Sequence, residues 1–157
     1  IGDFKTFLKL SPPLRTETDR NALVQGLNDK TIDVIVSDHK PEDEENKRLT
    51  FAQAETGASG IETLLPLSLE LYHNESVDLE TIIKALTSKP AEILKINKGN
   101  LSTGNDADFC IVDINKPWVV RKEKLISKSK NTPIEDKKLQ GKVISTFVNG
   151  EELFKSE

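Results

Sequence analysis

A short apolar run that ends in an acidic residue constrains the fold of this chain more than any other segment. Residues 32–36 are rich in β-branched side chains, as expected for a strand buried on both faces of a sheet. Residues 4–10 alternate apolar and polar side chains and also predict a strand. Between them lies a helical pattern that begins at a capping box of Thr16 and Asp19 and continues to about Asn28. Strand, helix, strand is a βαβ unit with parallel strands, so the sequence predicts an α/β fold.

Asp38 follows the second predicted strand and is the strongest candidate for a catalytic group. Barrel enzymes built from parallel strands place catalytic side chains at the carboxyl ends of those strands. A carboxylate there can bind a divalent metal and move a proton between an attacking water and a leaving nitrogen. The alternative is an aspartate that caps a helix or forms a turn, because Asp-x-x-Pro is a common sequence.

The other residues with reactive side chains support fewer functions. His39 and His73 are the only histidines, whereas a hydrolytic zinc site uses three protein ligands, mostly histidine. We expect His39 to be packed and hydrogen-bonded, with orientation of Asp38 as the alternative. His73 is expected to be exposed at the end of a helix. Cys110 is expected to be a small core residue.

Residues 57–60 form a glycine-containing segment that predicts a loop leading into a well-buried helix. Its backbone N–H groups could bind an anion at the start of that helix. The glycines could equally serve turn geometry alone, and both readings stay open. A further helix is expected after Asp78, which can cap it, and a short one from Ser88 to Leu94.

The pattern changes after Asn97, where glycines separate short β-prone runs and no helical period is visible. We therefore expect an α/β part at residues 1–96 and an all-β part at residues 97–157. The β-prone runs are Phe109–Val112, Trp118–Val120 and Val143–Val148.

Composition excludes several classes of protein. Among the 157 residues, 31% are charged and 36% are apolar, which is typical of a globular protein. The net charge of −4 and the lack of a basic stripe argue against a nucleic-acid partner. No apolar run approaches the roughly 20 residues of a membrane helix.

The single cysteine excludes an internal disulfide framework and favours the cytoplasm. Because the chain lacks methionine and a predicted strand lies close to Ile1, we expect a piece of a longer protein.

The stretch after the second predicted strand resembles the aspartate signature of dihydroorotases. In that signature a small residue, Ser or Thr, Asp, any residue, Ala, Pro and His precede a Lys. Asp38, Pro41 and Lys47 fit it, whereas Lys40 and Glu42 hold the Ala and His positions. Further segments similar to the family follow in chain order: 9–15, 51–63, 90–94, 104–108, 131–133 and 141–150.

The resemblance implies a metal-dependent (β/α)₈ barrel beside a small β-sandwich. It implies reversible hydrolysis of the cyclic amide of dihydroorotate to carbamoyl aspartate. This chain would be the C-terminal portion, with the last two barrel strands, their helices and most of the sandwich. Asp38 would be the metal-binding general acid/base, and Ser11, Glu42 and Gly57 would lie at substrate-binding positions. The longer protein would use zinc, whose other ligands would precede Ile1, so the isolated chain is expected to be inactive and to bind no zinc tightly.

Three substrate-side positions depart from the family pattern. Ser11 replaces a substrate-binding Asn, Glu42 replaces a substrate-binding His, and Glu55 replaces a loop Pro. The substrate carries carboxylates, so Glu42 reverses the local sign. A charge pair about 4 Å apart is worth roughly 4 kcal/mol at a surface-like dielectric. The longer protein is thus a dihydroorotase, an enzyme for another cyclic amide, or a non-catalytic scaffold that binds a partner such as aspartate transcarbamoylase.

A third alternative is a stand-alone domain without an active site, although its parallel strands would expose unpaired edges. The same edges lead us to expect that the isolated chain forms homo-oligomers or associates with the missing N-terminal half.

Overall fold

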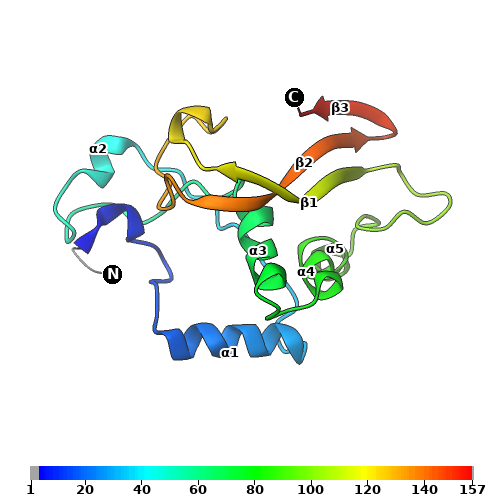
Figure 1. Cartoon of the computed structure of the whole chain (residues 1–157), viewed down its shortest axis with the longest axis horizontal. Helices are drawn as coiled ribbons and strands as arrows, with labels where there is room; N and C mark the ends of the chain where they lie inside the picture. The colour runs from blue at the N-terminus through cyan, green and yellow to red at the C-terminus, as the bar shows by residue number, and fades with distance from the viewer. Residues whose placement is uncertain (1–3, 157) are drawn as a thin grey trace. The chain divides into compact units, whose positions relative to one another are not determined.

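The computed structural model describes residues 4–156, and Figure 1 shows their helices and strands. The chain forms two compact units, each assembled from segments that are far apart in the sequence. The first unit contains residues up to 21, 37–64 and 119–138, and the second contains residues 22–36, 65–118 and 139 onward. The predicted division near residue 97 concerns the barrel and sandwich of a longer protein and stays a prediction.

Helices and a three-stranded sheet make up the regular structure of the described residues, which confirms the α/β class. The helices are α1 Glu17–Asn28, α2 Glu44–Lys47, α3 Leu64–His73, α4 Leu79–Leu86 and α5 Ser88–Leu94. The strands are β1 Phe109–Val119, β2 Lys138–Val148 and β3 Glu151–Lys155. Short 3₁₀ helices lie at Thr6–Leu8 and Lys122–Lys124. No helix of the described residues is long and apolar enough to cross a membrane.

Side-chain caps begin two of these helices where the sequence predicts them. At α1, the backbone N–H of Asp19 donates to Thr16 Oγ1 at 3.3 Å, and the Thr16 N–H donates to Asp19 Oδ2 at 3.0 Å. At α4, Asp78 accepts the N–H of Thr81 at 2.8 Å. Each cap satisfies backbone donors that have no partner inside their helix.

The core of the second unit is an apolar cluster. Leu27 of α1 packs with Val77, and with Ile82 and Ala85 of α4. These four residues are at most 6% exposed. Further apolar side chains pack against them from α1, α3, α4 and the segment after α1: Val24, Ile32, Ile35, Leu71, Tyr72 and Leu86.

The sheet lies largely in the second unit, with β2 between β1 and β3 (Figure 1). The antiparallel hairpin of β2 and β3 turns through Asn149 and Gly150, whose φ angles of 52° and 81° are the left-handed values of a type I′ turn. Pro117 lies within β1, which is an edge strand of this sheet, where a residue without an N–H group is tolerated.

Neither strand of the predicted βαβ unit is formed. Residues 4–10 contain the 3₁₀ helix Thr6–Leu8, so the strand predicted there is wrong. Residues 32–36 belong to no helix or strand, and the N–H of Ile35 donates to Ala85 O of α4 instead. A strand needs a neighbouring strand for its ladder of hydrogen bonds, and the described residues place none beside either segment.

Candidate functional site

Two loops of the first unit, 37–43 and 55–63, lie side by side and hold most of the predicted site residues. The N–H of Lys40 donates to Ala58 O at 3.0 Å. His39 Nδ1 accepts two backbone N–H groups, from Gly60 at 3.1 Å and Ile61 at 3.3 Å. His39 is therefore hydrogen-bonded within the protein, as expected, and fixes the chain at the entry to α3. Its accepting Nδ1 carries no proton in this arrangement.

Asp38 is exposed and has a left-handed backbone, with φ at 41°. Residues with a side chain adopt this region rarely, and such positions occur preferentially at functional sites. Among residues 4–156, no hydrogen bond or ion pair engages its carboxylate, including any from His39. The arrangement leaves the carboxylate open to a ligand from outside these residues.

Glu42 is held by its backbone and its side chain. Its N–H donates to Asn131 Oδ1 at 3.2 Å, and its carbonyl oxygen accepts the hydroxyl of Ser129. Its carboxylate lies 3.3 Å from Lys40 Nζ, and the Glu42 side chain is only 16% exposed. The carboxylate therefore faces a cation of its own chain at close range.

Lys47 is fully buried and joins three segments of the first unit. Its ammonium group donates to the carbonyl oxygens of Lys9 at 3.2 Å, Glu55 at 2.8 Å and Gly57 at 3.0 Å. Burial lowers the pKa of Lys47, and the carboxylate of Glu42 partly opposes this shift. The three carbonyl groups match the three donors of an ammonium group, so Lys47 fixes the spacing of these backbones.

Asn131 is a second buried polar residue that joins the loops. Besides Glu42 N–H, its Oδ1 accepts the hydroxyls of Ser59 at 3.1 Å and Ser129 at 2.6 Å. Its Nδ2 donates to Gly57 O at 3.3 Å. No role was expected for Ser59, Ser129 or Asn131 from the sequence. The match of residues 131–133 to the family pattern was the available signal.

Gly57 lies where the two buried polar groups meet, because its carbonyl oxygen accepts from both Lys47 and Asn131. Its φ of 137° is unfavourable for other residues, and a Cβ atom there would lie 2.5 Å from Lys40 O. Its N–H donates to Lys9 O at 3.1 Å. The position therefore requires glycine for both its conformation and its close backbone contact.

Ser11 is exposed and lies two residues after Lys9, which ties this segment to the second loop. Lys9 Nζ donates to Ala52 O at 3.0 Å and Ala54 O at 2.6 Å. The structure thus brings Glu42 and Gly57 together through Asn131 and places the Ser11 segment beside them. No hydrogen bond or ion pair between residues 4–156 joins the side chains of Asp38, Ser11 and Glu42.

Residues 4–156 do not gather the donors needed for a zinc site. Among the described residues, no three His, Cys, Asp or Glu side chains lie in a group that could hold a metal ion. Asp38 offers one carboxylate, and His39 Nδ1 is occupied by backbone donors. The zinc implied by the resemblance therefore does not fit the described residues alone.

His73 and Cys110 lie elsewhere, in the second unit, and both differ from expectation. His73 ends α3 but is half-buried, with Nε2 3.0 Å from Ile114 O of β1. Cys110 is exposed, as is the next residue of β1, Ile111. The predictions of an exposed histidine and a core cysteine are both wrong.

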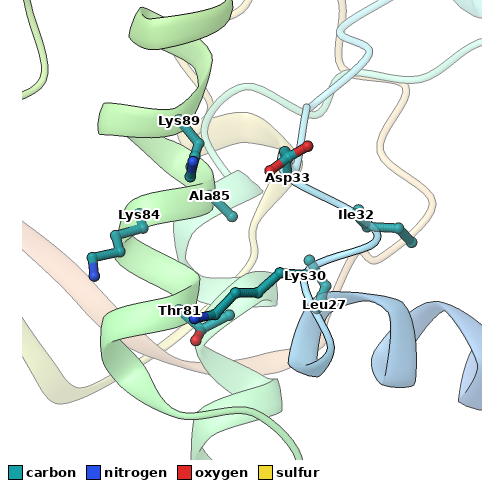
Figure 2. Close-up of a pocket in the computed structure, with 8 residues that line it drawn as sticks. All are labelled: Leu27, Lys30, Ile32, Asp33, Thr81, Lys84, Ala85 and Lys89. Carbon is teal, nitrogen blue, oxygen red and sulfur yellow. The ribbon is translucent and has the colours of Figure 1, made fainter.

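A cleft of about 190 Å³ also lies in the second unit, and Figure 2 shows the residues that line it. Three of them are lysines, but Lys84 pairs with Glu80 at 2.6 Å and Lys89 pairs with Glu92 at 3.0 Å. Lys84 points away from the cleft in Figure 2. The cations are thus largely compensated by their own helices, so we assign the cleft no function.

Comparison with known proteins gives a consistent family. The sequence profile of the amidohydrolase family matches residues 10–153. A dihydroorotase of Anaplasma phagocytophilum (strain HZ) is 44% identical over 152 residues, which are 97% of this chain and 34% of that protein. A dihydroorotase of Geotalea daltonii is 41% identical over 157 residues, which are 100% of this chain and 37% of that protein.

Solved structures agree in fold. The L-hydantoinase (dihydropyrimidinase) from Arthrobacter aurescens superposes with a TM-score of 0.87 at 30% identity, covering 97% of this chain and 35% of that one. A dihydropyrimidinase from Brevibacillus agri gives the same TM-score at 23% identity and covers 96% of this chain and 34% of that one. The chain thus spans about a third of the length of the relatives that it matches.

Proposed function

Because this chain belongs to the amidohydrolase family, we propose that it is the C-terminal part of a longer cyclic amidohydrolase of the dihydroorotase type. Its reaction is the reversible opening of the ring of dihydroorotate to carbamoyl aspartate. The observation that carries the proposal is Asp38, an exposed carboxylate on a left-handed residue without a partner among residues 4–156. It stands near the start of the loop 37–43, which a hydrogen bond to the buried Asn131 holds in place.

Asp38 acts as the general acid/base in this proposal. Its carboxylate accepts a proton from the attacking water and returns it to the ring nitrogen as the amide bond breaks. The carboxylate of Asp38 has no hydrogen-bond partner among residues 4–156, so it is accessible for proton exchange with a bound water or substrate.

Glu42 and Gly57 belong to the substrate side in this proposal, with Ser11 beside them. Lys47 and Asn131 act on that side as positioning residues, because both bind the carbonyl oxygen of Gly57. Preorganised groups contribute to catalysis because they need no reorganisation during the reaction. The spacing of the substrate loops is thus set before a substrate binds.

Zinc belongs to the longer protein in this proposal. Asp38 is the ligand that this chain would offer, and the remaining ligands come from outside residues 4–156. The isolated chain is therefore inactive. The proton transfer at Asp38 is the only step that we assign to the described residues.

Activity of the full-length protein tests the proposal. We expect the full-length protein to hydrolyse dihydroorotate with bound zinc, and the 157-residue chain to show no hydrolysis at any zinc concentration. Stoichiometric tight zinc binding together with amide hydrolysis by the isolated chain would contradict the proposal. So would a zinc-loaded full-length protein that opens no cyclic amide.

A non-catalytic scaffold is the second candidate, and the substitutions at the substrate side favour it. Ser11, Glu42 and Glu55 stand where the family has Asn, His and Pro. Such a scaffold would bind a partner such as aspartate transcarbamoylase. Co-elution of the full-length protein with that partner, without hydrolysis of cyclic amides, is the result expected for a scaffold.

A further inference from the structure

Two departures from the dihydroorotase signature are neighbours in space. The Ala position of the signature holds Lys40, and the His position holds Glu42. In the structure, Lys40 Nζ lies 3.3 Å from Glu42 Oε1. The sequence thus exchanges a small residue for a cation and a histidine for an anion, and the two new charges meet.

The backbone of Lys40 is fixed against the Gly57 loop. Its N–H donates to Ala58 O at 3.0 Å, and its Nζ donates to Thr56 Oγ1 at 3.4 Å. The Cβ and Cδ atoms of Lys40 each lie 3.1 Å from the place where a Cβ atom would project from Gly57. Lys40, which is two residues after Asp38, therefore packs against Gly57, and we have placed Gly57 on the substrate side.

The exposure of the two side chains differs in a way that assigns them different roles. Glu42 is 16% exposed, whereas the Lys40 side chain is 54% exposed. An ammonium group has three donors. The Lys40 ammonium group forms an ion pair with Glu42 and donates a hydrogen bond to Thr56, and no other hydrogen bond among residues 4–156 engages it, so it has donors left for a ligand.

We propose that Lys40 is a substrate-binding residue that selects a cyclic amide bearing a carboxylate, and that Glu42 is the positioning residue that holds it. This inference rests on the proposed function and names the source of its specificity. The negative charge of Glu42, which alone would repel an anionic substrate, is compensated by Lys40. The cation that the family places at residue 42 is supplied here from residue 40.

An ordinary surface ion pair is the competing explanation. Exposed pairs contribute little to stability, and loss of such a pair would affect all substrates alike. Specificity for a carboxylate predicts a selective effect instead. Loss of Lys40 should weaken the binding of an anionic substrate and leave the binding of its uncharged analogue unchanged.

The experiment compares Lys40→Ala with the wild type in the full-length protein. We expect the KM for dihydroorotate to rise at least tenfold, with a much smaller change in kcat. One tenfold step corresponds to about 1.4 kcal/mol. The inhibition constant of dihydroorotate methyl ester, in which the carboxylate is neutral, should change less than twofold. Lys124→Ala is the matched control, because Lys124 is an exposed lysine of the same unit.

A second set of variants tests whether Lys40 and Glu42 act together in substrate binding. Glu42→Gln should raise the KM by a few-fold, because Lys40 loses its anchor but keeps its charge. The double variant Lys40→Ala/Glu42→His restores the residues of the family signature, and it should recover most of the affinity that Lys40→Ala loses. The single variant Glu42→His completes the cycle, and independent contributions would make the effects of Lys40→Ala and Glu42→His add.

The outcomes separate the inference from the proposed function. Equal losses of Lys40→Ala for dihydroorotate and its methyl ester, or a double variant no better than Lys40→Ala, overturn the role of Lys40 alone. A zinc-loaded wild type that neither hydrolyses dihydroorotate nor binds it in calorimetry overturns the proposed function, and the inference with it.

Discussion

The two units of this chain bury different kinds of side chain. In the first unit, the buried polar residues are Lys47, Ser59, Thr63, Asn131 and Thr132, beside the apolar Ala54, Val120 and Leu125. In the second unit, the buried apolar residues are Leu27, Leu69, Val77, Ile82, Ala85, Ala91 and Leu139, beside the polar Ser68 and Ser145. Hydrogen bonds therefore organise the first unit, whereas apolar packing organises the second.

The two kinds of buried side chain stabilise the two units in different ways. Buried apolar surface stabilises a fold without regard to direction, which suits helices that pack on one another. Buried polar groups demand partners in defined directions, so a fully satisfied network specifies one arrangement of its loops. Every buried side-chain nitrogen and oxygen of the described residues has a partner. The loops that carry Asp38, Lys40 and Gly57 belong to the unit with this directional order.

Removal of the Lys47 ammonium group should lower the free energy of unfolding most strongly. Lys47→Met keeps the approximate volume but removes the charged donor from the carbonyl groups of Lys9, Glu55 and Gly57, of which Glu55 O has no other donor among residues 4–156. Hydrogen bonds to charged groups contribute about 1.5–3 kcal/mol each and are not additive, so we expect a loss of about 4 kcal/mol. Urea unfolding of the full-length protein measures it, with Lys124→Met as the control. A loss no larger than that of the control would show that apolar packing holds the first unit too.

A cavity in the second unit should have the next largest effect. Ile82 is fully buried, so Ile82→Ala should lower the free energy of unfolding by about 3 kcal/mol through lost packing. Ile83, its neighbour in α4, is 39% exposed, and Ile83→Ala should cost much less. Urea unfolding of both variants gives the contrast. Dihydroorotate hydrolysis by Ile82→Ala should persist below its unfolding midpoint, whereas Lys47→Met should lose activity even while folded.

Loss of the Asn131 side chain should be smaller but should act on the same loops as Lys47. Asn131→Ala removes the acceptor of Ser59, Ser129 and Glu42, and we expect a cost of about 2 kcal/mol. Asn46→Ala, at an exposed asparagine of the same unit, is the control. Combining Asn131→Ala with Lys47→Met should give less than the sum, since both side chains bind Gly57 O. Strict additivity would argue against a shared network.

The smallest effect is expected at the cap of α4. Hydrogen bonds from the Thr81 hydroxyl and backbone N–H hold the pKa of Asp78 below its ordinary 3.8. At pH values around these pKa values, the unfolded state therefore binds more protons than the folded state. The stabilising contribution is complete above pH 3.8 and is lost as the pH falls through the lowered folded-state pKa. Asp78→Asn should keep the cap without this dependence, whereas Asp78→Ala should lose the cap at every pH. If Asp78→Asn and the wild type lost equal stability in acid, the ionisation of Asp78 would be excluded as the cause of the loss.

Local signals in the sequence predicted the elements that depend on local contacts. Thr16 with Asp19, and Asp78, each cap the helix that they were expected to begin. The third strand, β3, was missed although Asn149 and Gly150 are a strong hairpin signal. Glu151, Glu152 and Lys155 of β3 are charged and all five of its residues are exposed, so the segment shows no apolar alternation.

The remaining features depend on partners far away in the sequence. Nothing near Lys47 indicates burial, because its acceptors come from residues 9, 55 and 57, and lysine is almost never buried without partners. The run at residues 32–36 has the composition of a strand, but a strand also needs a neighbour. For the site, the sequence indicated Asp38, Glu42 and Gly57. The pairing of Lys40 with Glu42 was not expected from the sequence, although the two residues are only two positions apart.

The most direct measurement is the turnover of dihydroorotate by the full-length protein carrying Asp38→Asn, with zinc content determined in the same samples. The substitution keeps the size of the side chain and removes its capacity to take up a proton. We predict that kcat falls roughly 100- to 10,000-fold, the usual contribution of a general acid/base, while the protein remains folded. A variant that retains zinc and turns over dihydroorotate at the wild-type rate would contradict the role of Asp38 and the account built on it.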